Sequence, residues 1–246
     1  MIRFIIVAVT VVGFLVLSIP LLLIEALIGK FSPYKKDISS LRIIQAVFKF
    51  PLFLAGVDVT VIGEENVPKD TPVLYIGNHR SYFDILLTYS RCPIRCGYVA
   101  KIEMERYPLL SNWMKNLHCL FLDREDLKQG LKTILTAIEK VRAGISICIF
   151  PEGTRNRAKS ELDVMPFHDG SLKIATKTGC PIIPMALNNT AEIFEAHLPK
   201  IRKCHVVLEY GKPIYPKELD KENLKHIGAY TRDIIVEMVK KNQALV

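Results

Sequence analysis

Two long apolar stretches open the chain. The first runs from Phe4 to Ile24 without a charged residue. As a helix it is long enough to cross a hydrocarbon core of about 30 Å. Gly13 and Pro20 are points where such a helix can kink. We therefore expect this stretch to lie in a membrane.

The second stretch runs from Leu41 to about residue 57, after a connector predicted over residues 29–40. Its polar side chains Arg42, Gln45 and Lys49 recur at spacings of three and four, which places them on one stripe of a helix. This pattern favours a helix in the membrane interface, with its basic stripe toward lipid headgroups. The alternative is a helix that packs on its own domain. The helix could also do both, with one face toward the lipid headgroups and another face against the domain.

Residues 1–56 are thus predicted to form a two-helix membrane anchor. Whether its first helix spans or re-enters the bilayer is left open by the sequence. Lys30, Lys35 and Lys36 follow that helix. By the positive-inside rule they favour a globular domain on the cytoplasmic side of the cell membrane.

From residue 57 onward, short apolar or alternating runs take turns with amphipathic stretches. Strands are predicted at residues 57–62, 71–77, 96–100, 119–122, 145–150, 182–187 and 206–210. Helices are predicted after Ser81 and at residues 104–117, 126–144, 170–178 and 223–240. The 126–144 helix is expected to bury one face made of Leu127, Leu131, Ile134, Leu135, Ile138 and Val141. This alternation predicts an α/β domain over residues 57–246 with a helix-covered, largely parallel sheet.

Composition narrows the class of partner. Half of the 246 residues are hydrophobic and the net charge is +8, which suits a membrane surface. The basic residues form no concentrated run, so we expect no nucleic-acid partner. The six cysteines are scattered, without a second pair at zinc-ligand spacing. We interpret them as free thiols in a reducing compartment and expect no metal site.

The segment Asn78-His79-Arg80-Ser81-Tyr82-Phe83-Asp84 offers a base and a carboxylate between a strand and a helix. Residues five apart do not share a helix face, but a turn can bring His79 and Asp84 together. The alternative is structural, because Ser81 and Asp84 also have the spacing of a capping box.

Polar clusters follow four of the predicted strands. They are His79 with Asp84, then Lys101, then Asp123 with Arg124, and finally Glu152-Gly153-Thr154-Arg155. Ligands of parallel sheets bind beyond the carboxyl ends of the strands, so the four clusters should share one crevice. The last cluster suits an anion, because glycine permits close approach, threonine offers a hydroxyl and arginine can fork onto phosphate oxygens. Ser81 or a cysteine as covalent nucleophile lacks support from the pattern.

Two motifs strongly resemble those of the glycerolipid acyltransferases, in particular the lysophosphatidic acid acyltransferases. They are Asn78-His79-x4-Asp84 and Phe150-Pro151-Glu152-Gly153-Thr154-Arg155. Three shorter segments look like further blocks of that family: Val99-Ala100-Lys101, Phe121-x-Asp123-Arg124 and Ile182-Ile183-Pro184-Met185. The resemblance as a whole covers about residues 70–190. The chain departs from the pattern at His118, where glycine is frequent, and at His168, where many members have lysine.

The resemblance implies acyl transfer from an acyl carrier protein or coenzyme A thioester to the 2-hydroxyl of lysophosphatidic acid, forming phosphatidic acid. His79 would be the general base and Asp84 would orient its ring. Arg155 and Arg124, with Lys101, would hold the acceptor's phosphate, and Glu152, Gly153 and Thr154 would help to form its site. Backbone N–H groups near Gly153 would stabilise the oxyanion. No metal or organic cofactor is required.

Two alternatives stay open at this point. The acceptor could instead be glycerol-3-phosphate or another lysophospholipid. The chain could also be a non-catalytic membrane adaptor that binds anionic lipid. Acyl-chain length, the identity of the carrier and the oligomeric state are not encoded in these motifs.

Overall fold

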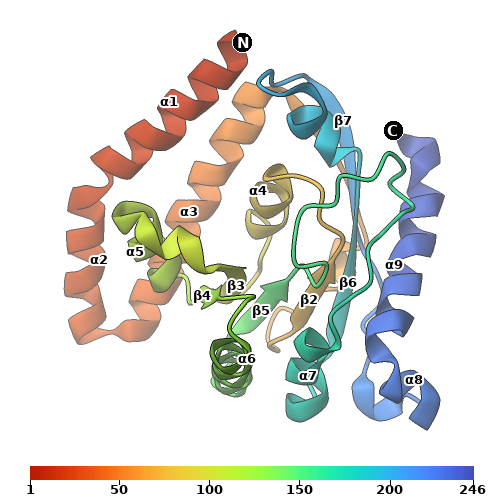
Figure 1. Ribbon diagram of the computed structural model, residues 1–246. Helices are drawn as coiled ribbons and strands as arrows, with labels where there is room; N and C mark the ends of the chain where they lie inside the picture. Colours follow the sequence, from red (N-terminus) through yellow and green to blue (C-terminus); the bar gives the residue numbers. More distant parts are fainter.

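The computed structural model describes all 246 residues, and one seven-stranded sheet forms its centre (Figure 1). The strands are β1 (Val57–Ile62), β2 (Leu74–Gly77), β3 (Cys96–Lys101), β4 (Leu120–Leu122), β5 (Ser146–Ile149), β6 (Ile182–Asn188) and β7 (Cys204–Tyr210). Their order is β1-β7-β6-β2-β5-β3-β4. Only the β6–β7 pairing is antiparallel. The predicted α/β fold with a largely parallel sheet is therefore confirmed.

Helices cover both faces of the sheet (Figure 1). One face carries α3 (Pro33–Ala55), α4 (Phe83–Tyr89) and α5 (Pro108–Asn116), and the other carries α6 (Leu127–Arg142), α7 (Asp169–Thr178) and α9 (Ile227–Asn242). Strand β2 lies in the middle and is buried throughout. Its Tyr75 joins the core on the α3–α4 face, while Leu74 and Ile76 join the core on the opposite face. Burial on both faces explains why this strand reads as a continuous apolar run.

The N-terminal apolar stretch is divided at Ser18. Helix α1 (Ile2–Leu17) and helix α2 (Ile19–Phe31) meet at an angle of 47°. Pro20 stands in the first turn of α2, where its missing N–H costs nothing. The hydroxyl oxygen of Ser18 accepts a hydrogen bond from Trp113 Nε1 at 2.8 Å. The kink expected near Pro20 is thus confirmed, but α1 runs unbroken through Gly13, where a kink was also expected. The region therefore has three helices in place of the expected two.

The connector predicted over residues 29–40 is wrong. Helix α2 continues to Phe31, and α3 already begins at Pro33. Ser32 alone separates them, and its hydroxyl accepts from the N–H of Lys35 as an N-cap. Most of the large apolar side chains of α1 and α2 are exposed. By length and composition, α3 could cross a membrane, and so could the bent α1–α2 pair.

Helix α3 packs on the domain with part of its polar stripe. Gln45 is buried and donates to the backbone oxygens of Tyr89 at 3.3 Å and Cys92 at 2.7 Å. Arg42 and Lys49 are exposed. The expectation that Gln45 faces lipid headgroups is therefore wrong, because its amide satisfies carbonyl groups at the end of α4.

Two helix predictions fail in detail. On α6, Ile138 and Val141 are buried as expected, but Leu127, Leu131 and Leu135 are exposed. The underlying strand β4 has three residues and forms the edge of the sheet, so it cannot cover the outer half of the helix. The closing helix is interrupted at His226, which separates α8 (Lys221–Lys225) from α9.

Gly97 of β3 is a testable packing constraint. A Cβ there would overlap the carbonyl oxygen of His118. His118 has a φ of +59°, a conformation that favours glycine. We expect Gly97→Ala to lower the free energy of unfolding by about 1–3 kcal/mol, since the backbone contact must separate. Thermal denaturation in detergent measures this.

Gly170→Ala on α7 is the matched control. A Cβ at Gly170 meets no atom within 4 Å, so this variant should keep or slightly raise the melting temperature. Equal melting temperatures for wild type and Gly97→Ala would contradict the packing argument.

Candidate active site

The turn between β2 and α4 is fixed to the neighbouring strand by Asn78. Its Nδ2 donates to the backbone oxygen of Leu187, and its Oδ1 accepts from the N–H of the same residue, both at 2.9 Å. This two-point contact uses the backbone N–H and C=O of a residue near the carboxyl end of β6. The segment that carries His79 therefore starts from a rigid point.

His79 and Asp84 are brought together by that turn. His79 Nδ1 lies 2.8 Å from Asp84 Oδ2, and the Asp84 side chain is fully buried. The same oxygen accepts the N–H groups of Arg80 and Ser81, each at 2.8 Å. Because a carboxylate only accepts, His79 Nδ1 must carry the proton, which leaves Nε2 as the basic nitrogen. The capping geometry and the histidine contact thus coexist on one carboxylate.

Phe150 supports the imidazole from the adjacent strand. It follows β5, and its ring stacks on that of His79 with a centroid distance of 4.3 Å and an interplanar angle of 14°. The side chain of His79 is 14% exposed. One face of the ring is thereby covered while an edge of the imidazole stays accessible.

Glu152 joins the two sequence motifs. Its Oε1 accepts the N–H of His79 at 2.7 Å, and its Oε2 accepts Asn156 Nδ2 and the N–H of Met165 at 3.1 and 2.9 Å. Burial raises the pKa of this carboxyl, while the hydrogen bonds from Met165, His79 and Asn156 lower it in part. Glu152 was predicted to bind substrate. Its oxygens are engaged by protein donors, so the geometry makes it a residue that holds the turn.

Gly153 closes the loop after β5. Its φ is +74°, which favours glycine. A Cβ there would also lie 3.4 Å from Nε2 of His168, so the histidine that departs from the family pattern packs against this loop. The N–H of Gly153 donates to Phe150 O at 3.1 Å. That amide is therefore occupied within the turn and is not a free donor for an oxyanion. Thr154 is exposed.

Arg155 is held between an acid and an aromatic ring. Its Nη1 lies 3.0 Å from Glu195 Oε1, and its guanidinium carbon lies 3.6 Å from the centroid of Tyr82. Tyr82 belongs to the same turn as His79, so the guanidinium of Arg155 lies beside the turn that carries the imidazole. The sequence did not predict Glu195, which lies in the short helix η4 (Glu195–His197), because no motif surrounds it.

Lys101 and Arg124 lie farther out. Lys101 is the last residue of β3, and Arg124 follows β4. The four clusters do share one edge, because β2, β5, β3 and β4 are adjacent and parallel. However, β4 stands three strands from β2, which is roughly 14 Å at ordinary strand spacing. Lys101 is 54% exposed and paired with Glu103, and Arg124 is exposed. Neither forms a hydrogen bond or an ion pair with His79, Asp84 or Arg155.

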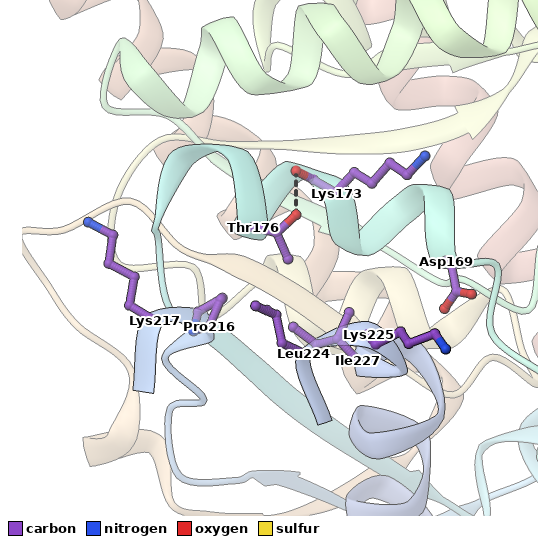
Figure 2. Close-up of a pocket in the computed structure, with 8 residues that line it drawn as sticks. All are labelled: Asp169, Lys173, Thr176, Pro216, Lys217, Leu224, Lys225 and Ile227. Atoms are coloured by element: carbon purple, nitrogen blue, oxygen red, sulfur yellow. Dashed lines mark hydrogen bonds between the residues drawn. The ribbon is translucent and has the colours of Figure 1, made fainter. Parts of the chain in front are cut away.

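Two hollows of the surface lie away from His79. One of about 360 Å³ lies between α7, α8 and the start of α9. Figure 2 shows Lys173 and Lys225 extending to its Asp169 side, while Lys217 points the other way. The Lys217 side chain lies against Gly179, at the end of α7. Another hollow of about 410 Å³ follows the edge strand β4 and is lined by His118 and Lys140. Neither contains a predicted site residue.

The thiols and Ser81 are not placed as nucleophiles. All six cysteines are free, as predicted. Burial raises the pKa of Cys119 to about 11, so little thiolate forms near neutral pH. The hydroxyl of buried Ser81 donates to Glu195 Oε2 at 2.6 Å and accepts from the N–H of Phe83.

Comparison with known proteins agrees with this arrangement. The model of the acyltransferase family matches residues 58–188, which include both motifs. The chain belongs to the acyltransferase family. The family suggested by the two sequence motifs is confirmed.

Named relatives and a solved structure extend this match. The 1-acyl-sn-glycerol-3-phosphate acyltransferase of Borreliella burgdorferi is 34% identical over 210 residues, which are 82% of this chain and 79% of that protein. The yeast Saccharomyces cerevisiae protein of the same name is 30% identical over 76% of this chain, which spans 62% of the yeast protein. The crystal structure of the 1-acyl-sn-glycerophosphate (LPA) acyltransferase PlsC from Thermotoga maritima superposes with a TM-score of 0.84 at 25% identity. It covers 99% of this acyltransferase and 95% of its own chain.

The bridging role of Glu152 can be tested by an isosteric change. In Glu152→Gln one carboxylate oxygen becomes an NH2 group, which must then face an N–H or NH2 donor. We expect the free energy of unfolding to fall by about 1–3 kcal/mol, the cost of leaving a buried donor unsatisfied. Acyl transfer should also slow, because the N–H of His79 loses its anchor.

Glu139→Gln is the control for this substitution. Glu139 is exposed on α6, so its change should leave both the melting temperature and the rate unaltered. A Glu152→Gln enzyme as stable and as fast as wild type would contradict the assigned role.

Proposed function

We propose that this acyltransferase moves a fatty acyl chain from an acyl thioester to the 2-hydroxyl of lysophosphatidic acid and forms phosphatidic acid. The observation that carries the proposal is the His79–Asp84 contact of 2.8 Å beside a held arginine, Arg155, at the carboxyl edge of the sheet. A base next to a cation suits an alcohol that also bears a phosphate. The names of the relatives point to the same acceptor.

The reaction needs one proton shuttle. Nε2 of His79 takes the proton of the acceptor hydroxyl as its oxygen attacks the thioester carbonyl carbon. The tetrahedral intermediate then collapses, the carbon–sulfur bond breaks, and the leaving thiolate takes the proton from the imidazolium. Asp84 stabilises the imidazolium between the two steps. A thioester is already activated, so no acyl-enzyme is required.

The acceptor's phosphate is assigned to Arg155. Its guanidinium has five N–H donors, and Glu195 engages Nη1, so several remain for phosphate oxygens. Lys101 and Arg124 are proposed as outer cations that attract the anionic headgroup along the same edge. Thr154, exposed next to Arg155, adds a hydroxyl. The oxyanion would be stabilised by N–H groups after Gly153, such as those of Thr154 and Arg155, in place of the occupied Gly153 amide.

The donor and the location complete the proposal. The acyl chain arrives as an acyl carrier protein or coenzyme A thioester, and the chemistry requires no metal or organic cofactor. The exposed apolar surface of α1 and α2 would immerse the N-terminal region in the cell membrane, with the catalytic domain on the cytoplasmic side. Because a one-chain lipid resides in that bilayer, the acceptor would reach His79 from the membrane.

The base assignment predicts a complete loss of product from one variant. Detergent-solubilised wild type with lysophosphatidic acid and a long-chain acyl thioester should yield phosphatidic acid, measured by mass spectrometry. His79→Ala should yield none above background while it stays folded and membrane-bound. His226→Ala, which changes an exposed histidine between α8 and α9, should retain the wild-type yield.

Other outcomes separate the alternatives. Phosphatidic acid from His79→Ala at the wild-type rate would keep the activity and reject the base. Free fatty acid formed without acceptor would indicate a thioesterase. Product only with glycerol-3-phosphate or another lysophospholipid would change the acceptor. Lipid binding without any product would indicate a non-catalytic adaptor.

A further inference from the structure

We propose that Glu195 is a positioning residue for the acceptor's phosphate: it fixes the guanidinium of Arg155 and the ring of Tyr82 as one anion-binding unit. The inference rests on the proposed function, since it concerns the phosphate site of the same reaction. Glu195 belongs to none of the sequence motifs that resemble the family. It lies on the segment that follows β6.

The contacts of Glu195 connect three separate parts of the chain. Oε1 accepts Arg155 Nη1 at 3.0 Å and the N–H of Tyr82 at 2.8 Å, and Oε2 accepts Ser81 Oγ at 2.6 Å. Ser81 and Tyr82 belong to the catalytic turn, and Arg155 belongs to the loop after β5. The Glu195 side chain is 16% exposed. One largely buried carboxylate thus joins the turn of the base to the loop of the cation.

This geometry fixes where Arg155 can act. An arginine side chain has many rotamers in solution, and a phosphate that binds it must bear the cost of ordering it. Here the ion pair with Glu195 fixes one edge of the guanidinium, and the Tyr82 ring covers one face at 3.6 Å. The remaining N–H groups keep their direction before the ligand arrives. Glu195 also holds the backbone of Tyr82, so its loss would release both the ring and the cation.

A purely stabilising ion pair makes a different prediction. Such a pair would change the melting temperature and leave the KM of each substrate unaltered. Loss of a positioning residue changes the KM for the acceptor and leaves the KM for the thioester unaltered. A substituted side chain that keeps the hydrogen bonds restores the KM for the acceptor. A third possibility is competition, in which Glu195 occupies Arg155 against the phosphate. Its removal would then lower the KM of the acceptor.

The experiment compares initial rates of five proteins with lysophosphatidic acid and an acyl thioester: wild type, Glu195→Ala, Glu195→Gln, Arg155→Ala and the double variant Arg155→Ala/Glu195→Ala. We expect Glu195→Ala to raise the KM for lysophosphatidic acid about tenfold, with kcat and the KM for the thioester near wild type. Glu195→Gln, which can still accept from Arg155 and Tyr82, should restore most of the affinity. The double variant should match Arg155→Ala, since Glu195 acts through Arg155.

Glu192→Ala is the matched control. Glu192 lies three residues earlier, is half exposed and pairs with His197 instead of Arg155, so its loss should not change the KM for lysophosphatidic acid. If Glu195→Ala does not fold, Glu195→Asp replaces it. Aspartate keeps the charge, but its side chain is one methylene shorter and does not reach Arg155 and Tyr82 in the same way. Glu195→Asp should therefore also raise the KM for lysophosphatidic acid.

Each contrary result has one meaning. If Arg155→Ala raises the acceptor's KM while Glu195→Ala, or Glu195→Asp in its place, does not, the positioning role is overturned and the proposed function stands. If Glu195→Ala lowers the KM, or if its effect multiplies that of Arg155→Ala in the double variant, the positioning role is likewise overturned. If Arg155→Ala leaves the KM unchanged, the phosphate assignment and this inference both fail.

Discussion

The structure depends on one buried carboxylate, that of Asp84. A carboxylate removed from water is costly unless donors surround it. Asp84 obtains its donors from the turn that precedes it: His79 Nδ1 and the N–H groups of Arg80 and Ser81. These contacts leave the turn little freedom, because each fixes a different residue against the first turn of α4. The orientation of the imidazole is therefore a consequence of how the helix begins.

Two further acids extend this arrangement outward. Glu152 ties the backbone of His79 to the loop after β5, and Glu195 ties the next residues of the turn to Arg155. In both cases a carboxylate organises donors, while the proposed substrate contacts are left to a basic nitrogen and to cations. Lys101 and Arg124 lie at the carboxyl ends of strands farther along the same edge. The site thus has a rigid inner part around His79 and exposed cations at its periphery.

The sequence predicts what depends on local pattern. Alternating strands and helices indicate the parallel sheet, and the spacing of His79 and Asp84 identifies the turn. It could not predict contacts that depend on distant segments. Arg42, Gln45 and Lys49 share a helical stripe, but only the position of α4 decides that Gln45 is buried. Leu127, Leu131 and Leu135 have the periodicity of a core face, yet the short edge strand β4 leaves them exposed. Glu195 reaches Arg155 only because β6 pairs beside β2.

The role of Asp84 is tested most directly by the turnover of Asp84→Asn, compared with that of His79→Ala and of the double variant. Asparagine can keep one oxygen for the three donors, so the turn should persist, and the melting temperature verifies this. We expect kcat of Asp84→Asn to fall by about 10²–10⁴. The double variant should be no slower than His79→Ala, because the two residues act as a unit. A folded Asp84→Asn enzyme with near-wild-type turnover would contradict the central role given to this carboxylate.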